Sequence, residues 1–215
     1  INNNGIQGNS SGAKLINLFN DRGLSTFSNI QVHGNYGITK DVSANGYTGT
    51  NNFQTLGESA IYIGNSASFV LGGASDLTFK DISVKDNNFI LTGTSVNMRP
   101  YTVFNCSGVF KDNYCKINID AKVNQPLVLI DTPRGLEVSG NTTESLTQSG
   151  SIGAASAAMQ LAKNLNYAGD ADIHHNTLTG DSMAFNFNQL ANGNWGTTES
   201  NIKLHNNKFD GATPA

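Results

Sequence analysis

One stretch decides the fold of this chain: Phe79-Lys80-Asp81-Ile82-Ser83-Val84-Lys85-Asp86-Asn87-Asn88-Phe89. Ile82 and Val84 stand five and three residues before Asn87, and Phe89 stands two residues after it. Apolar residues at alternate positions are typical of a short strand, and Asn is typical of a turn. With h for an apolar residue, the unit h-x-h-x-x-N-x-h predicts a strand, a turn and the start of a second strand.

The same unit recurs along the chain, which indicates a repeat architecture. Its copies centre on Asn35, Asn87, Asn113, Asn141, Asn176 and Asn207. The separations are 52, 26, 28, 35 and 31 residues, and since 52 is twice 26 we expect a skipped copy near residues 61–65. An earlier copy is expected to end at residues 6–9. Second strands that close on Asn or Asp are expected at residues 15–20, 103–105, 127–131 and 185–188.

Two architectures repeat at about this length. A leucine-rich repeat has a similar apolar pattern, but the segments between the Asn residues are rich in Gly and Thr and lack a Leu-rich helical arc. Leucine-rich repeats stack into a horseshoe, and the second strand expected in each unit does not fit that architecture. We therefore expect an all-β fold, a right-handed parallel β-helix of about seven rungs with Asn-rich turns and loop insertions. The insertions are expected at residues 36–60, 143–157 and 189–200.

Asn suits the corner of such a rung for two reasons. A corner residue often needs a positive φ, which Asn tolerates better than most residues other than Gly. Rungs stack about 4.8 Å apart, so the Asn amides at one corner are expected to hydrogen-bond to each other as a ladder. The narrow core needs few apolar residues, which accounts for an apolar fraction of only 38%.

The composition narrows the functional classes. The 215 residues suit one domain over residues 1–215, and the chain opens on Ile1 without Met, so we expect it to be part of a larger protein. A net charge of −3 with scattered Lys and Arg argues against a nucleic-acid partner. No apolar run approaches the length of a membrane span. The two cysteines are expected to be buried thiols, and neither a metal nor another cofactor is expected.

The repeated units resemble the pectate-lyase-like superfamily of right-handed parallel β-helices, above all bacteriophage tailspikes and polysaccharide depolymerases, over residues 6–211. The resemblance implies a glycan-active protein that is extracellular or on the virion surface, and for a tailspike it implies a homotrimer. The sequence lacks the Asn-Thr-Asp motif of polygalacturonases, the Asp-Pro-His-Asp motif of mannuronan epimerases and the Arg-x-Pro-x-x-Arg motif of pectate lyases. The resemblance therefore does not assign a particular reaction.

Positions two and four residues before each Asn point outward if positions three and five point inward. These two outward columns carry cations flanked by acids, and we expect an extended glycan to lie across them. Lys85, Lys111 and His174 are the substrate-binding candidates on this face. The columns read His33, Lys85, Lys111, Ser139, His174, His205 and Gln31, Ser83, Val109, Glu137, Asp172, Lys203.

Glu137, Asp172 and Asp112 are the catalytic candidates. Glu137 and Asp172 are expected on neighbouring rungs, and carboxyl groups about 5 Å apart suit retaining hydrolysis whereas about 6.5–9.5 Å suits inverting hydrolysis. A lyase needs instead a base and a cation beside a uronate, for which Lys111 and His174 are candidates. Two solvated acids that happen to align are the alternative explanation of this pattern.

Three further residues are predicted to bind substrate. Tyr114 follows Asn113, and Trp195 stands in a loop rich in Gly and Asn. Both rings are suited to stacking on sugars, and for Trp195 an anchor that caps the fold is the alternative. Arg134 has a guanidinium suited to a carboxylate or sulfate, although a local salt link within its turn is the alternative.

From these observations we expect the protein to bind a bacterial surface polysaccharide such as capsule or O-antigen. As an enzyme, it is expected to depolymerise that glycan. The enzyme would be a glycoside hydrolase or a polysaccharide lyase. Two alternatives stay open, a non-enzymatic shaft or adhesin domain and a leucine-rich-repeat-like module that binds proteins.

Overall fold

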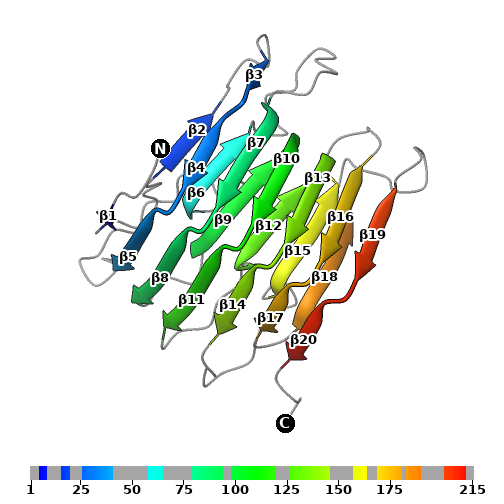
Figure 1. The fold of residues 1–215 in the computed structure, drawn as a ribbon. Coiled ribbons are helices and arrows are strands. Elements are labelled where there is room, and N and C mark those ends of the chain that lie inside the picture. The colour runs from blue at the N-terminus through cyan, green and yellow to red at the C-terminus, as the bar shows by residue number, and fades with distance from the viewer. Residues whose placement is uncertain are drawn as a thin grey trace.

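The computed structural model describes residues 5–8, 16–19, 26–40, 58–64, 79–93, 98–119, 126–145, 157–163, 169–180, 183–189 and 201–211. Every regular element within these residues is a β-strand. Figure 1 shows the strands stacked in the order of the chain, from blue to red. The all-β prediction is therefore confirmed for this part of the chain.

Three sheets, which we call A, B and C, hold these strands. Sheet A contains β3 (Phe27–Ser28), β4 (Gln31–His33), β7 (Phe79–Lys85), β10 (Cys106–Lys111), β13 (Arg134–Ser139), β16 (Asp170–His174) and β19 (Ile202–His205). Sheet B contains β1 (Gly5–Gly8), β5 (Tyr36–Lys40), β8 (Asn88–Gly93), β11 (Tyr114–Ile119), β14 (Thr142–Ser145), β17 (Thr177–Gly180) and β20 (Lys208–Gly211). Sheet C contains β2 (Ile16–Phe19), β6 (Glu58–Gly64), β9 (Met98–Phe104), β12 (Val128–Asp131), β15 (Ala157–Lys163) and β18 (Met183–Gln189).

The chain visits the three sheets in a fixed order. From β2 to β20 it passes through sheet C, then sheet A, then sheet B, and repeats this cycle. Neighbouring strands pair in parallel in all three sheets. This arrangement is consistent with a parallel β-helix, and it differs from a horseshoe, which has one parallel sheet and packs its other segments outside it.

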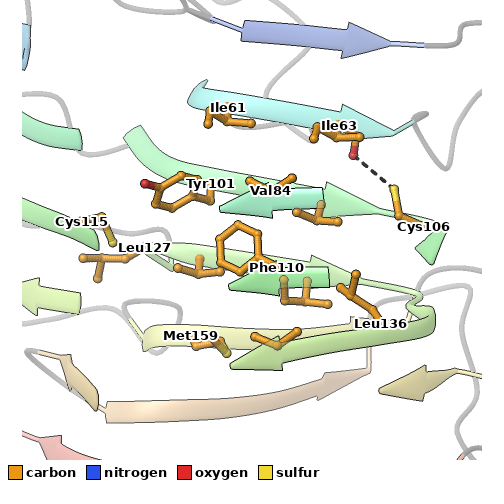
Figure 2. Packing of buried hydrophobic residues seen from close by; sticks show 14 of the residues in the cluster. Ile61, Ile63, Val84, Tyr101, Cys106, Phe110, Cys115, Leu127, Leu136 and Met159 are labelled. Carbon is orange, nitrogen blue, oxygen red and sulfur yellow. Dashed lines mark hydrogen bonds between the residues drawn. The ribbon is translucent and has the colours of Figure 1, made fainter. Parts of the chain in front are cut away.

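The core lies between the sheets and is built from alternate residues of each strand. Tyr101 of sheet C lies edge-on between Phe89 and Phe110, with ring centroids 5.9 and 5.2 Å apart. Its hydroxyl lies 3.0 and 2.9 Å from the carbonyl oxygens of Asn87 and Tyr114, which share its one donor hydrogen, so its one polar atom is satisfied inside the core. Figure 2 shows Tyr101 and Phe110 within the apolar cluster. Each such ring contributes about 1.5–3 kcal/mol through burial.

The two cysteines are buried free thiols, as predicted. Cys106 Sγ lies 2.9 Å from the carbonyl oxygen of Phe104 and 3.9 Å from that of Ile63, the second contact being drawn in Figure 2. Burial raises the pKa of Cys106 and of Cys115 well above the ordinary thiol value. Both therefore stay protonated at neutral pH, the form of cysteine that does not react as a nucleophile.

The corner between sheets A and B carries the asparagine ladder. At each step, the backbone N–H and Nδ2 of one Asn both donate to Oδ1 of the next Asn, over 2.8–3.2 Å. From Asn87 onward, Nδ2 also donates to the carbonyl oxygen three residues before the preceding Asn, at 2.9–3.1 Å. The predicted ladder is confirmed, with members Asn35, Asn87, Asn113, Asn141, Asn176 and Asn207.

The positive φ that we predicted for the ladder Asn falls on the residue before it. A single left-handed residue turns the chain, and the following Asn can then aim its amide into the corner. Gly, Asp, Asn and His occupy this position, and these are the residue types that tolerate left-handed backbone best. The six residues have φ between 53° and 66°: Gly34, Asp86, Asp112, Gly140, His175 and Asn206.

The two extra copies of the repeat are wrong predictions. Ile61 and Ile63 lie on β6 in sheet C, paired with Tyr101 and Val103 of β9. The separation of 52 residues spans one cycle with long connections, because Tyr36 of β5 pairs directly with Asn88 of β8. Residues 5–8 form β1 in sheet B, after the corner and not before it.

The second strands and the insertions follow the predictions in part. The four segments predicted as second strands fall on β2, β9, β12 and β18, and all four belong to sheet C. The insertions predicted to begin at residues 36 and 143 begin later, because β5 continues through Lys40 and β14 through Ser145. Sheet C therefore contains all four of the predicted apolar segments that end in Asn or Asp.

Candidate functional site

The outer face of sheet A carries the two columns predicted from the sequence. Each member of a column pairs with the next across sheet A, so both columns run unbroken over the strands from β4 to β19. We name them by their distance from the ladder Asn. The −2 column is His33, Lys85, Lys111, Ser139, His174 and His205, and the −4 column is Gln31, Ser83, Val109, Glu137, Asp172 and Lys203.

The last three strands of this face hold an acid–imidazole cluster, which we define as Glu137, Ser139, Asp172, His174 and His205. Two diagonal contacts repeat from strand to strand. His174 Nε2 lies 3.5 Å from Glu137 Oε1, and one strand further along His205 Nε2 lies 2.9 Å from Asp172 Oδ1. Each contact joins the −4 residue of one strand to the −2 residue of the next, so the geometry follows from the register of the sheet.

Each carboxylate and imidazole of the cluster has a defined neighbour. Ser139 Oγ donates to Glu137 Oε1 at 2.8 Å. The rings of His174 and His205 are stacked, with centroids 5.1 Å apart and planes 13° apart. His175, in the turn after β16, places its Nδ1 2.7 Å from that of His174. Three imidazoles and two carboxylates therefore occupy one continuous surface.

The carboxylates and imidazoles of the cluster are accessible from outside, whereas Ser139 is buried. The side chains of Glu137, Asp172 and His205 are 40%, 43% and 46% exposed, and that of His174 is 22% exposed. Carboxylate oxygens accept hydrogen bonds and imidazole nitrogens donate or accept them. A ligand rich in hydroxyl groups can therefore exchange hydrogen bonds with both kinds of side chain at once.

The other end of the −2 column holds His33 and two lysines. His33, Lys85 and Lys111 are direct register partners on three neighbouring strands, and His33 Nε2 lies 2.7 Å from Ser83 Oγ. Two like charges directly opposite each other in a sheet destabilise it. The Lys85–Lys111 pair is suited to an anionic or hydroxyl-rich ligand that spans both strands.

The remaining predicted site residues do not join this cluster. Asp112 occupies the left-handed corner position, with its carboxylate against Gly140 at the equivalent corner after β13. Tyr114 lies on sheet B, and Arg134 begins β13 opposite Asp170. Trp195 lies outside the described residues. The predicted set is thus split, with Glu137, Asp172, His174, Lys85 and Lys111 together on sheet A.

Tyr114 belongs to a separate surface on sheet B. It is the register partner of Asn88 and Thr142. Partial burial raises the pKa of Tyr114 to about 12, and a hydrogen bond and charge from Glu144 add to this effect. Glu144 also lies 3.2 Å from the ammonium group of Lys116. Tyr114 is therefore tied to an ion pair on sheet B, across the corner from the acid–imidazole cluster.

Sequence reasoning did not name Ser139 and His205 as site residues, although both stand in the −2 column. The signal was the column itself, because every member of a register-matched column shares one face. The choice of Glu137 and Asp172 rested on their being acids. The structure adds that each acid has a diagonal partner on the next strand, Glu137 in His174 and Asp172 in His205.

Over β6, β9, β12 and β15, the outward side chains of sheet C are buried. Tyr62, Thr102, Leu129 and Gln160 are successive register partners that alternate with core residues, and each is at most 7% exposed. Between these two sheets, sheet A is the one that offers its outer face to a ligand.

No group of three or more His, Cys, Asp or Glu side chains within the described ranges is arranged to hold a metal ion. The described part of the chain also has no helix with the length and apolar character of a membrane span. No protein-family model, curated protein or solved structure matches the chain.

Proposed function

We propose that this chain is a right-handed parallel β-helix of about seven rungs that binds a bacterial surface polysaccharide on the outer face of sheet A. The cyclic order of the three sheets supports the β-helix, and crossover connections between parallel strands are almost always right-handed. The observation that most directly supports the binding function is the acid–imidazole cluster beside the Lys85–Lys111 pair. It is a continuous, accessible polar face on a rigid support.

The shape of this face suits an extended ligand. Its side chains recur once per strand, about every 4.8 Å across the sheet, so a linear polymer can meet the same kind of group several times. Each exposed contact is weak by itself, and the sum over several strands supplies affinity. The proposed setting is the one implied by the resemblance of the repeats, a tailspike-like, homotrimeric protein on a virion or outside a cell.

Cleavage is a second candidate function, favoured by one observation. Glu137 and Asp172 are direct register partners on β13 and β16, so their carboxylates project from adjacent strands of one face. Two such groups on either side of a glycosidic bond are the catalytic requirement of most glycoside hydrolases. For a lyase, His174 beside Glu137 is the base candidate and Lys111 the cation candidate.

A panel of purified capsular and O-antigen polysaccharides tests the proposal. We expect at least one member to bind, with affinity lowered about tenfold or more in Lys85→Ser/Lys111→Ser, since each lost contact to an anion costs about 1 kcal/mol. The matched control is Lys116→Ser, a lysine on sheet B, which leaves binding unchanged. Absence of binding to the whole panel would contradict the proposal and favour the shaft alternative.

The same panel separates binding from cleavage. New reducing ends indicate a hydrolase, absorbance from unsaturated uronates indicates a lyase, and binding without either product rejects cleavage. If products form, Glu137→Gln and Asp172→Asn should each abolish them, with Glu144→Gln on sheet B as the matched control. Full activity in both variants would remove these two carboxylates from the catalytic assignment.

A further inference from the structure

The end of the stack formed by β18, β19 and β20 exposes inward-facing apolar side chains. Each of these three strands is the last of its sheet (Figure 1). Phe187, Leu204 and Phe209, one from each strand, are 51%, 45% and 46% exposed, and we call the surface that they define the open end. Their register partners one strand earlier are all 0% exposed: Leu161, Ile173 and Leu178. The core is therefore left uncovered at its last step.

The asparagine ladder also stops at the open end. The backbone N–H of each earlier ladder Asn donates to Oδ1 of the next Asn. Asn207 is the last member, and no Asn follows it in the sequence. Its backbone N–H therefore lacks the ladder acceptor that every earlier member has. An occupant of the open end continues the ladder only if it brings an Asn side-chain oxygen to this corner.

The charges on sheet A set a further requirement. The −4 residue of one strand contacts the −2 residue of the next, Glu137 with His174 and Asp172 with His205. Lys203 is the exposed −4 residue of β19, the last strand of this sheet. The same diagonal would bring its ammonium group beside the −2 residue of a following strand. A carboxylate is the complementary group at that position, since opposite charges on neighbouring strands attract.

A second copy of this chain does not meet these requirements. Stacked head to tail, it would have to offer Oδ1 of Asn35 to Asn207, but Asn35 is 0% exposed. Ile16 and Val32, inward residues at the same end as Asn35, are 5% and 0% exposed and are therefore already covered. Two open ends placed face to face would run their strands in opposite directions, which cannot continue a parallel ladder.

We propose that the open end is a docking surface for a strand–corner–strand segment of a partner polypeptide, which adds in parallel to β19 and β20. The register fixes the residue types of that segment. Apolar residues lie opposite Ile202, Leu204 and Phe209. An Asn lies opposite Asn207, and an acid stands two residues before it. The recognised pattern is therefore apolar-x-apolar-acid-x-Asn-x-apolar, and this inference does not depend on polysaccharide binding.

The open end offers such a segment two kinds of interaction. The unpaired N–H and C=O groups along the edges of β19 and β20 can accept a further strand. When a strand adds to a sheet edge, main-chain hydrogen bonds supply affinity and the alternate side chains supply specificity. Covering Phe187, Leu204 and Phe209 removes exposed apolar surface from water, which favours docking.

The probe is a synthetic peptide with the sequence of residues 82–91 and the substitution Lys85→Glu. It supplies the pattern from a repeat of this chain, with the acid added at the −2 position. We expect saturable binding to the 215-residue chain, measured by the fluorescence anisotropy of the labelled peptide. The peptide should also raise the temperature of thermal unfolding, because a ligand that binds the folded state stabilises it.

Three control peptides test the pattern. Asn87→Ala in the probe removes the ladder acceptor and should weaken binding about tenfold, equivalent to about 1.4 kcal/mol. The peptide that retains Lys85 places a like charge beside Lys203 and should bind about threefold more weakly, the size expected for an exposed ion pair. A scrambled peptide of the same composition should not bind. Equal binding of the scrambled or the Asn87→Ala peptide would reveal an unspecific apolar surface and overturn the inference.

Phe209→Ser and Phe27→Ser are a matched pair of variants, because each ring is 46% exposed. Phe209 belongs to the open end, whereas Phe27 lies at the other end and stacks on Phe79 with ring centroids 5.5 Å apart. Phe209→Ser should weaken binding of the probe about tenfold or more, equivalent to about 1.4 kcal/mol, and Phe27→Ser should leave it unchanged. Cooperative thermal unfolding without peptide verifies that each variant is folded. Equal effects of the two substitutions would contradict docking at the open end.

Sedimentation over a range of protein concentrations tests a second copy as the occupant. Self-association that Leu204→Ser abolishes would place a second copy at the open end and overturn the inference. Failure of the probe to bind overturns it as well. That failure leaves the proposed function standing, because the polysaccharide is proposed to bind the outer face of sheet A and is measured with a separate panel of ligands.

Discussion

The asparagine ladder and the −2 column of sheet A are two polar columns that cross the same strands, two residues apart in every repeat. In the ladder, Asn113 and Asn141 are 2% and 1% exposed, and their amides are hydrogen-bonded on both sides. In the −2 column, His205 is 46% and His174 22% exposed, whereas Ser139 is buried and bonded to Glu137. The asparagines at the corner therefore hold the fold together, while most side chains two residues earlier keep part of their polar surface available to a ligand.

The largest expected effect comes from breaking the ladder in its middle. Asn113→Ala removes the acceptor of the backbone N–H and Nδ2 of Asn87, and the donor to the carbonyl oxygen of Val84. Each buried group left without a partner costs about 1–3 kcal/mol, so we expect the free energy of unfolding to fall by about 3 kcal/mol or more. Denaturant unfolding measures this change.

The end of the ladder provides the matched control. Asn207 is the last ladder member and is half-buried, and its Oδ1 accepts from the N–H and Nδ2 of Asn176. Water can replace an amide at this position, so Asn207→Ala should cost about 1 kcal/mol. Equal losses of unfolding free energy in the two variants would contradict the idea that burial determines how much each ladder Asn stabilises the fold.

The second effect contrasts ionisation inside the molecule with ionisation on its outer face. Burial raises the pKa of the Cys106 thiol, and at Cys115 the charge of Glu144 adds to the effect of burial. A thiol whose pKa is higher in the folded than in the unfolded state stabilises the fold below the unfolded pKa of about 8.5, and that stability is lost as the pH rises. The loss is about 1.4 kcal/mol per thiol for each pH unit above that value.

Thermal unfolding between neutral pH and about one unit above the ordinary thiol pKa checks this prediction. The melting temperature should fall with pH, and it should fall less steeply in Cys106→Ala and Cys115→Ala. Rapid modification of the thiols in the folded protein would show that they are accessible and would refute the argument. Alkaline pH is therefore expected to act on stability through the core.

Much of this organisation could be predicted from the sequence because the ladder residue is the same in every repeat. Six Asn residues at matching offsets fixed which residues pair across sheet A, and the register of both outward columns followed from them. The alternation of inward and outward side chains then placed Lys85, Lys111, Glu137, Asp172 and His174 on one face. The placement of these five candidates on one face could be predicted from the repeat and from the alternation of side chains along a strand.

Other features depend on geometry that a pattern of residues does not contain. The doubled separation before Asn87 is a numerical coincidence, since long connections and a missing repeat give the same count. The diagonal contact of Glu137 with His174 depends on side-chain directions across two strands. The positive φ before each ladder Asn was visible as a run of Gly, Asp, His and Asn, but the corner was assigned to the wrong residue.

The third effect tests that corner residue. Gly140 has φ +66°, and a Cβ added there would collide with the Asp112 carboxylate. Gly140→Ala should lower the free energy of unfolding by about 1–3 kcal/mol through left-handed strain and this collision. Asp112→Ala in the same chain removes the collision, and part of the loss should then be recovered. No recovery would show that backbone strain alone is responsible.

The smallest effect compares the outer faces of sheets A and B. On sheet B, Lys116 and Glu144 form a half-exposed ion pair of 3.2 Å, and such pairs contribute about 0–1 kcal/mol. Glu144→Gln should therefore change stability little. It should still lower the pKa of Tyr114 from about 12, because the hydrogen bond and charge of Glu144 both raise that pKa, while burial keeps it above its ordinary value.

An absorbance titration of the phenol groups measures this shift, and Tyr114→Phe identifies the transition that belongs to Tyr114. The variant Glu144→Gln should leave polysaccharide binding on sheet A unchanged, whereas Glu137→Gln removes a charged acceptor from the acid–imidazole cluster and should alter it. Both residues are partly exposed glutamates paired with a basic side chain of a neighbouring strand. If both substitutions altered binding equally, the assignment of the ligand to sheet A would be wrong, and the ligand would have to reach across the asparagine corner.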